Sequence, residues 1–429
     1  MAIIKIEMKT SKIYAIGGQI RDELLNRPIH DRDYVIVGST IEEMLSLGYK
    51  QVGVEFPVFL HPETKDEYAL ARTEKKIGDK HTDFAFDFNP SVTLFEDCSR
   101  RDFTINAICR DLETGEIVDY FNGIQDLKDK VIRHINDDFK LDPLRVLRAV
   151  RFSCQLNFTI AEETKDICKR MVLDGMLNHL TEERIWKEIE KALNTKCFDK
   201  FLEGLDEIGA LKVILPEIYE LKNTEENPKW HPEGNTYNHT LLCLKQIKER
   251  IEDENISFIN FGIMCHDLGK QLTPMEKRPS HHGHDDVGGE IVERLCARLK
   301  LPNVYRDFAK QCCKYHMKMY QFLDMTVKKQ YDMINEVTKF KDKLNLDMLI
   351  KVHICDQFGK LRESTDEEVQ YMLNTITRIN LIYSILYGVG LEQLPNDTQL
   401  MLSKFSGKKF GELYRAAKIS YLKHYLYKV

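Results

Sequence analysis

The sequence predicts an α+β fold in which a small mixed α/β domain precedes domains made only of helices. Three observations support this class. A chain of 429 residues is too long for one ordinary core and indicates two to four domains. Beyond Asp142, apolar residues recur at three- and four-residue spacing almost throughout. Before Asp142, strand-like runs are separated by helical or turn-rich pieces, and these runs lie at 12–16, 33–37, 51–54, 67–71 and 116–120.

The helical part begins with well-defined amphipathic segments. Their apolar stripes predict helices that bury one face each. Polar or turn-rich stretches mark the expected joints, at 136–143, 222–228 and 270–286. The segments are 144–156, 162–177, 182–194, 198–209, 237–251, 287–299 and 305–319.

Composition and charge exclude several classes of protein. The formal net charge of -6 argues against general coating of nucleic acid, although residues 403–429 carry seven Lys and Arg against the single acid Glu412. Eleven cysteines without a CxxC pair, and no apolar run of membrane-spanning length, predict reduced thiols, no membrane association and a cytoplasmic location. The basic end either meets RNA or packs its tyrosines inward as an amphipathic helix.

The first chemically informative stretch combines a glycine turn, an arginine and two carboxylates. Gly17 and Gly18 end the strand-like run 12–16, where the backbone can approach a phosphate, and Arg21 follows on the next helix. Alternation along the second strand places Asp31 and Asp33 on one face, which favours a hard divalent cation. Together they predict phosphoryl transfer, whereas each piece alone reads as an ordinary turn or charged corner.

Two further carboxylate and arginine groups extend this prediction. Glu67 is the candidate for a third carboxylate on a neighbouring strand, the alternative being a surface acid on an edge strand. The run 99–107, which contains Arg101, alternates polar and apolar residues as a ribose and phosphate contact would need, the alternative being a solvated basic turn.

The helix expected after Asp142 carries a pattern suited to reading a base. Asp142 before Pro143 is typical of a helix start, and Arg145 lies one turn further on. An acceptor beside a donor matches the edges of cytosine and adenine, and not those of uracil and guanine. Arg148, at the next turn, is placed to meet phosphate, while Arg151 has turned away and reads as structural.

A second set of chemically informative residues lies in the helical half. His239, the adjacent pair His266 and Asp267, and Asp356 can enclose one divalent metal on converging helices, and imidazoles suit Ni, Mn, Co or Zn better than Mg. Any one histidine alone is more often a surface or core residue. Further histidines are candidates for positioning a phosphate or a second ion, or are simply solvated: His281, His282, His284 and His316.

These motifs, in this order, resemble the class II tRNA nucleotidyltransferases, or CCA-adding enzymes, and the related bacterial poly(A) polymerases. The motifs are 17–22, 31–33, 100–107 and 142–145. The runs 56–62 and 67–74 resemble the bacterial multifunctional CCA proteins, and the His, His-Asp, Asp set resembles the HD phosphohydrolases. The likeness extends from Lys12 to about residue 360.

The resemblance implies a nucleotidyltransferase head at 1–140, a helical neck at 141–222, an HD body at 223–360 and a tRNA-binding tail at 361–429. It implies Mg²⁺ on Asp31 and Asp33, and base recognition by Asp142 and Arg145. ATP or CTP would be bound by Gly18, Arg21, Arg101, Arg145 and Arg148.

The implied activity is template-independent addition and repair of the tRNA 3'-terminal CCA by a monomer or dimer. The HD site would hold Ni²⁺, Mn²⁺ or Co²⁺ on His239, His266, Asp267 and Asp356 and act as a 2',3'-cyclic phosphodiesterase, 2'-nucleotidase or phosphatase. One departure is Leu141, where many members have Glu. The alternatives are a poly(A) polymerase of the same fold, or chiefly an HD phosphohydrolase with vestigial transfer.

Overall fold

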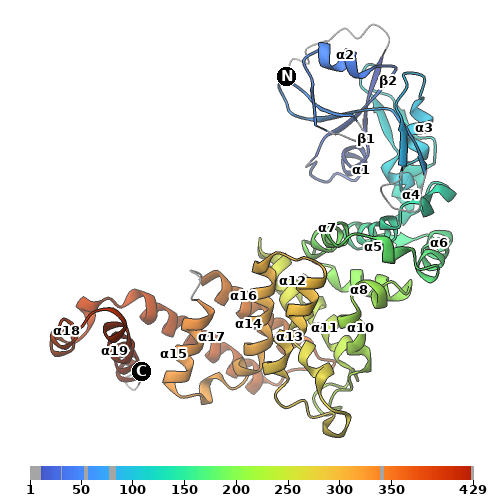
Figure 1. Cartoon of the computed structure of the whole chain (residues 1–429). Helices are drawn as coiled ribbons and strands as arrows, with labels where there is room; N and C mark the ends of the chain where they lie inside the picture. The colour runs from blue at the N-terminus through green and yellow to red at the C-terminus, as the bar shows by residue number, and fades with distance from the viewer. Residues whose placement is uncertain (1–10, 30, 53–56, 77–83, 339–342, 427–429) are drawn as a thin grey trace. The chain divides into compact units, whose positions relative to one another are not determined.

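The computed structural model describes residues 11–29, 31–52, 57–76, 84–338 and 343–426 (Figure 1). The chain divides into two compact units, the first formed by Met1–Glu188 with Glu203–Ile214 and the second by Ile189–Leu202 with Leu215–Val429. A mixed sheet lies in the first unit and the second is built from helices, which confirms the predicted α+β class. The four-part division at 140, 222 and 360 stays a prediction.

The first unit is organised around a seven-stranded sheet with the order β3-β4-β5-β2-β1-β8-β9. β2 and β5 pair in parallel, and the other neighbours pair antiparallel. Four of the five predicted strand runs coincide with β1, β2, β5 and β9; the fifth, 51–54, overlaps β3 and lies partly outside the described residues. The strands are β1 Lys12–Ile16, β2 Asp33–Val37, β3 Lys50–Gln51, β4 Val58–Leu60, β5 Glu67–Leu70, β8 Cys109–Asp111 and β9 Ile117–Val118.

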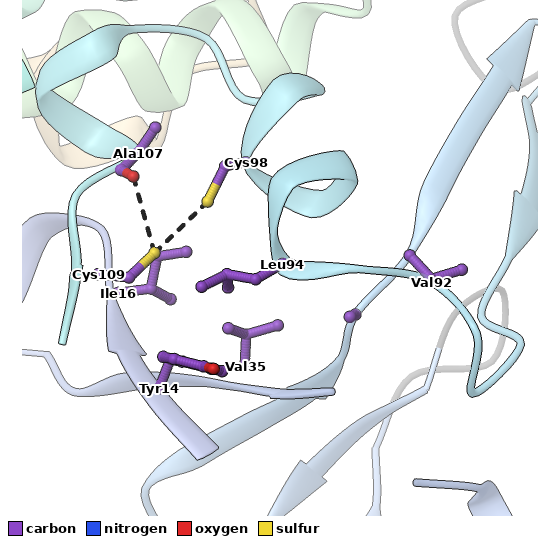
Figure 2. Close-up of a cluster of buried hydrophobic side chains, with 9 residues drawn as sticks. Tyr14, Ile16, Val35, Val92, Leu94, Cys98, Ala107 and Cys109 are labelled. Atoms are coloured by element: carbon purple, nitrogen blue, oxygen red, sulfur yellow. Dashed lines mark hydrogen bonds between the residues drawn. The ribbon is translucent and has the colours of Figure 1, made fainter. Parts of the chain in front are cut away.

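Side chains alternate along each strand, so apolar residues of one strand pack on both faces of this sheet. Ile36 and Leu70 pack with Met44 of helix α2, Ile41–Ser46, on one face. Figure 2 shows the other face, where Val35 lies near residues of α3, Leu94–Ser99. There the sulfur atoms of Cys98 and Cys109 point toward each other at 3.4 Å.

The remaining elements of the first half follow the predicted periodicity. The helix predicted at 162–177 ends at Leu173, because Gly175 adopts a left-handed conformation with φ of 71° and starts a short 3₁₀ turn at Met176–His179. A ribbon, β6 Thr73–Lys76 with β7 Phe84–Asp87, and a parallel pair, β10 Val131–Ile132 with β11 Thr159–Ile160, complete the strands. The helices are α1 Gly18–Leu24, α4 Gly123–Asp129, α5 Leu144–Leu156, α6 Glu162–Leu173, α7 Glu182–Leu193, α8 Phe198–Glu207 and α9 Leu211–Ile214.

The second unit packs four long helices side by side, α11, α12, α14 and α16, with α13 against α14 (Figure 1). α12 is buried along almost its whole length, so it forms the centre of this unit. The predicted helices at 237–251, 287–299 and 305–319 are confirmed, each starting one to three residues earlier. The helices are α10 Pro216–Tyr219, α11 Thr236–Arg250, α12 Ile256–Cys265, α13 His284–Arg298, α14 Asn303–Met319, α15 Val327–Val337, α16 Lys343–Phe358, α17 Asp366–Gly388, α18 Asn396–Leu402 and α19 Gly407–Leu426.

The cysteines form no disulfide bonds among the described residues. The eleven cysteines are free, and ten of them are buried, as the sequence predicts. Among the described residues, no helix combines the length and apolar character that crossing a membrane requires. In the basic stretch, Lys418 of α19 is buried and Tyr414 donates to the carbonyl of Val389 at 3.3 Å, so part of this stretch points inward.

Candidate functional site

Three carboxylates gather where β2 begins. Asp33 opens β2, Asp31 lies two residues earlier, and the parallel register places Glu67 of β5 opposite Asp33. Burial and then the Glu67 carboxylate raise the pKa of Asp33, Asp31 adds to the rise, and Arg101 opposes it. A divalent cation bound by oxygen ligands would relieve this repulsion, so the donor set fits Mg²⁺.

The glycine turn brings Arg101 beside these carboxylates. Gly17 connects β1 to α1 with φ of 78°, a conformation that favours glycine, and a Cβ placed there would lie 3.5 Å from Nη1 of Arg101. Nη2 of Arg101 donates to Asp97 at 3.1 Å, while its buried Nε donates no hydrogen bond to any described residue. The positive charge of Arg101 therefore lies beside both the glycine turn and Asp33.

A chain of hydrogen bonds joins α1 to α5. Nη1 of Arg21 donates to Asn106 at 2.8 Å, Asn106 donates to Asp102 at 3.0 Å, and Nε of Arg148 donates to Asp102 at 2.7 Å. Burial would raise the pKa of Asp102, but Arg148 and the Asn106 hydrogen bond lower it to about 2. Arg21 and Arg148 also flank the ring of Phe152, with Cζ at 5.1 and 5.3 Å from its centroid. Two predicted phosphate-binding arginines are thus brought together.

Asp142 and Arg145 lie at the start of α5, each held by another element. Oδ1 of Asp142 accepts from the backbone of Leu144 at 3.1 Å, and both of its oxygens accept from Arg184 of α7. Arg145 donates to the carbonyl of Arg100 at 2.6 Å and to that of Asp138 at 3.1 Å. Among the described residues, the two side chains have separate partners, and Arg184 is a partner that the sequence pattern does not indicate.

The four residues predicted to ligate metal in the helical half converge. His239 comes from α11, His266 and Asp267 follow α12, and Asp356 lies on α16; all are buried. Nε2 of His239 lies 3.1 Å from Oδ1 of Asp356 and 3.8 Å from Oδ2 of Asp267. Nε2 of His266 lies 3.2 Å from Oδ2 of Asp267 and 3.9 Å from Oδ1 of Asp356. Four donor atoms at these separations fit one cation.

Backbone carbonyls orient the two imidazoles. Nδ1 of His266 lies 2.6 Å from the carbonyl of Ile263, and Nδ1 of His239 lies 3.0 Å from that of Gly359. A carbonyl accepts only, so each Nδ1 carries the proton and each Nε2 presents its lone pair to the centre when the ring is neutral. Burial would raise the pKa of Asp267 and Asp356, but their positively charged neighbours and hydrogen-bond donors hold both pKa values well below the usual range, so both carboxylates are ionised.

Several residues of this site are absent from the sequence prediction, among them Cys243, whose Sγ lies 3.5 Å from Nε2 of His239. Nζ of Lys270 lies 2.8 Å from Oδ2 of Asp267 and 2.8 Å from Oε1 of Glu226. Lys270 follows Asp267 by three residues and could have been found from that spacing. Glu226 lies in the polar run 222–228, which the sequence suggests as a joint, yet its side chain is buried here.

The four additional histidines behave differently from one another. His284 and His316 lie against Oδ1 of Asp267, at 3.2 and 3.1 Å. His281 is bonded instead to Thr273 and to the carbonyl of Glu225, and His282 is exposed. A cavity is lined by these four histidines together with His239, Asp267 and Asp356. Its lining also includes cations and aromatic rings suited to a phosphorylated ligand, Lys360, Arg362, Trp230 and Tyr320.

Three segments of the chain match known families. Residues 13–133 match the family described as Poly A polymerase head domain, and residues 157–221 match the probable RNA and SrmB- binding site of polymerase A. Residues 236–346 match the HD domain. The carboxylate cluster thus lies within the first match, and His239, His266 and Asp267 within the third.

Relatives and solved structures extend the likeness over most of the chain. The fold resembles the Thermotoga maritima CCA-adding enzyme complexed with tRNA, with a TM-score of 0.61, 20% identity and coverage of 96% of this chain and 87% of that one. The multifunctional CCA protein of Mannheimia succiniciproducens is 43% identical over 352 residues, 81% of this chain and 84% of the relative. That of Pasteurella multocida is 44% identical over 354 residues, with the same coverage. The chain therefore belongs to the family of the multifunctional CCA proteins.

Proposed function

We propose that the first unit adds CCA to tRNA 3' ends, without a template, from CTP and ATP. The carboxylate group Asp31, Asp33 and Glu67 beside Arg101 carries this proposal. Family membership supports it, since multifunctional CCA proteins are 44% identical to this chain. The tRNA 3'-hydroxyl would attack the α-phosphate of the nucleotide, and pyrophosphate would leave.

Each group has a distinct part in this reaction. Mg²⁺ held by Asp31 and Asp33 would supply the charge that activates the hydroxyl and stabilises the leaving pyrophosphate. Arg21 and Arg101, with the backbone at Gly18, would bind the triphosphate and ribose. Arg148 would add positive charge at the far end of the hydrogen-bond chain through Asn106 and Asp102.

Selection of C and A would come from the start of α5. The carboxylate of Asp142 would accept from the exocyclic amino group, and the guanidinium of Arg145 would donate to the ring nitrogen. Uracil and guanine present the opposite order and would meet acceptor against acceptor. Arg184 supports this role because it fixes the carboxylate of Asp142.

The test uses full-length protein with tRNA ending at its discriminator base, given CTP, ATP or both, and sequencing of the product ends. We expect CCA with both nucleotides, and loss of incorporation in Asp31→Ala. Asp174→Ala, an exposed carboxylate at the end of α6, is the control and should retain activity. Incorporation by Asp31→Ala would contradict the proposal, and runs of A on many RNAs would favour a poly(A) polymerase.

We further propose that the HD site hydrolyses phosphoesters at damaged RNA 3' ends. The convergence of His239, His266, Asp267 and Asp356 beside a cavity whose lining includes Lys360 and Arg362 favours this second function. Ni²⁺, Mn²⁺ or Co²⁺ bound there would activate a water molecule toward a 2',3'-cyclic phosphate, a 2'-phosphate or another phosphomonoester. Such an activity would prepare tRNA for resynthesis of its end, which also favours the cytoplasm as the compartment.

The two functions separate by mutation. Asp356→Ala should abolish hydrolysis of a 2',3'-cyclic nucleotide and leave CCA addition within about twofold, and Asp31→Ala should do the reverse. Hydrolysis that survives in Asp356→Ala would contradict the hydrolase proposal. Hydrolysis without CCA addition by the unaltered protein would instead favour vestigial transfer.

A further inference from the structure

A tryptophan and an arginine line the cavity of the HD site without belonging to the metal ligands. The cavity has a volume of 480 Å³, within the range of about 300–1,000 Å³ that is usual for ligand sites. Its lining includes the proposed ligands His239, Asp267 and Asp356, and also Trp230 and Arg362. The ligands are buried, whereas Trp230 is 48% exposed. A large aromatic side chain at the exposed part of a ligand cavity offers a surface to a planar group.

The buried carboxylate of Glu233 fixes two segments of this cavity relative to a proposed metal ligand. Its Oε1 accepts from Nδ1 of His231 at 2.9 Å and lies 3.1 Å from Nδ1 of His239. Its Oε2 accepts from the backbone N–H of Leu361 at 3.4 Å. His231 directly follows Trp230, and its ring packs on that of His239 with the centroids 4.6 Å apart. Trp230 is therefore held beside the metal ligands by its neighbour in the chain.

Arg362 directly follows Leu361, and its guanidinium lies beside the indole of Trp230. Its Cζ is 5.4 Å from the centroid of the Trp230 ring. Nη1 and Nη2 donate to the two carboxylate oxygens of Glu368, at 2.9 and 2.6 Å. Because both terminal nitrogens are engaged, a bidentate clamp on phosphate through them would break the pair with Glu368. Arg362 therefore offers a ligand its positive charge and its planar face, on which a base can stack.

Lys360 supplies positive charge close to the metal ligands. Its Nζ donates to the hydroxyl of Tyr320 at 3.4 Å, and that hydroxyl is also hydrogen-bonded to Asp356. A phosphoryl group at the metal ligands would therefore lie near this ammonium group. The cavity thus combines a charged part suited to phosphate with an exposed aromatic part at Trp230, and a molecule that carries both a phosphate and a planar ring system matches the two parts.

We propose that the HD site recognises its substrate as a nucleotide, whose base stacks on Trp230 beside the guanidinium of Arg362 while its phosphoryl group lies at the metal ligands. This rests on the proposed hydrolase and names its substrate class, which is phosphoesters of nucleosides and not phosphoesters without a base. Stacking accepts every base, because every base has a planar face. The site therefore suits RNA 3' ends that differ in their last base.

Two cyclic phosphodiesters that differ in the base test the proposal. The full chain with Mn²⁺ is assayed on adenosine 2',3'-cyclic phosphate and on glycerol 1,2-cyclic phosphate. Trp230→Ala should lower kcat/KM for the nucleotide about 10- to 100-fold, chiefly through KM, and leave that for the glycerol compound within about twofold. Trp230→Phe should retain most of the activity, and Met275→Ala, an exposed apolar side chain of the same unit, is the control. An equal loss for both substrates, or none for either, would overturn the proposal.

Tryptophan fluorescence tests base binding separately from hydrolysis. The chain has two tryptophans, and Trp186 is buried. In Asp356→Ala, which should not hydrolyse the nucleotide, adenosine 2',3'-cyclic phosphate should quench the fluorescence saturably, and glycerol 1,2-cyclic phosphate should not. Adding Trp230→Phe should remove this quenching, because only Trp186 then remains. The absence of quenching, or equal quenching after Trp230→Phe, would overturn the proposal. Quenching that depends on Trp230, without hydrolysis by the unaltered protein, would support the base site and contradict the hydrolase function.

Discussion

Nη2 of Arg184 lies 3.0 and 2.8 Å from the two carboxylate oxygens of Asp142. With the hydrogen bond from the backbone of Leu144, this contact fixes the carboxylate that we propose to read the incoming base. The resemblance to CCA-adding enzymes leads us to expect Glu just before this Asp, where this chain has Leu141. In this chain the support comes instead from α7, 42 residues further along.

Replacing Arg184 should weaken base selection. Arg184→Gln removes a charge-assisted contact worth about 1.5–3 kcal/mol, so we expect the preference for CTP and ATP over UTP to fall about 10- to 100-fold. A positioning role predicts a larger effect on KM for the nucleotide than on kcat, and partial rescue by Arg184→Lys. Steady-state incorporation with each nucleotide measures this. Arg170→Gln, an exposed arginine on α6, is the control, and an unchanged CTP to UTP ratio in Arg184→Gln would refute the role.

Glu67 should matter for catalysis although the sequence alone left a surface role open. It lies opposite Asp33 in the parallel register and contributes to the raised pKa of Asp33. Glu67→Gln should lower kcat for CMP addition about 10- to 100-fold and raise the Mg²⁺ concentration needed for half-maximal rate. Glu63→Gln, in the preceding turn, should leave both unchanged. Equal Mg²⁺ dependence in the two variants would place Glu67 outside the site.

The sequence predicts those helices, strands and sites that depend on local residue patterns. Strand alternation and helical periodicity located β1, β2 and α5 to the residue, and the adjacent pair His266 and Asp267 indicated a metal site from the sequence alone. Gly175 ended α6 earlier than periodicity suggested, because its conformation, and not its hydrophobicity, decides where the helix stops.

Contacts between residues far apart in the sequence could not be predicted from such local patterns. Arg184 stands beside Glu182 and Glu183 in α7, and nothing local distinguishes it as the partner of Asp142. Glu226 was placed in a polar joint, because burial of a charge depends on the arrival of Lys270 from elsewhere in the chain. The different surroundings of the four histidines could likewise not be read from the sequence: His284 and His316 lie against Asp267, His281 is buried against Thr273 and Glu225, and His282 is exposed.

Low pH should lower the stability of the first unit by protonating Asp102. Burial would raise the pKa of this carboxyl, but Arg148 and Asn106 lower it to about 2, below the value of about 3.9 expected when unfolded. A carboxyl whose pKa is lower in the folded than in the unfolded state stabilises the folded protein at pH values above the unfolded pKa. This contribution is lost as the pH falls through the folded pKa, and here the loss is about 2 kcal/mol between about pH 4 and 2. The pair with Arg148 should therefore be strong at pH 6 and weak near pH 2.

Chemical unfolding of wild type and Asp102→Asn at several pH values tests this. The variant leaves Arg148 without its carboxylate, so we expect it to be about 3 kcal/mol less stable at pH 6. That difference should shrink by about 2 kcal/mol near pH 2, where the wild-type carboxyl is also protonated. Asp174→Asn, exposed on the same unit, should show no such dependence. A difference that is constant with pH would refute the assigned shift.

Gly269 should be essential to the HD site for a steric reason. It lies two residues after Asp267, and a Cβ there would overlap the carbonyl oxygen of His284 and approach the backbone nitrogen of Gly288 to 2.9 Å. Gly269→Ala must therefore push the turn after α12 away from the start of α13, which separates His284 from Asp267. A displacement of about 1 Å at a reacting centre can lower the rate about 100-fold. We expect hydrolysis of a 2',3'-cyclic nucleotide to fall by that factor while CCA addition by the first unit continues.

Gly289→Ala is the matched control, because its Cβ would lie an ordinary 3.6 Å from Lys310. Full hydrolysis by Gly269→Ala, with Mn²⁺ binding unchanged, would show that the contact between this turn and α13 does not position the metal ligands.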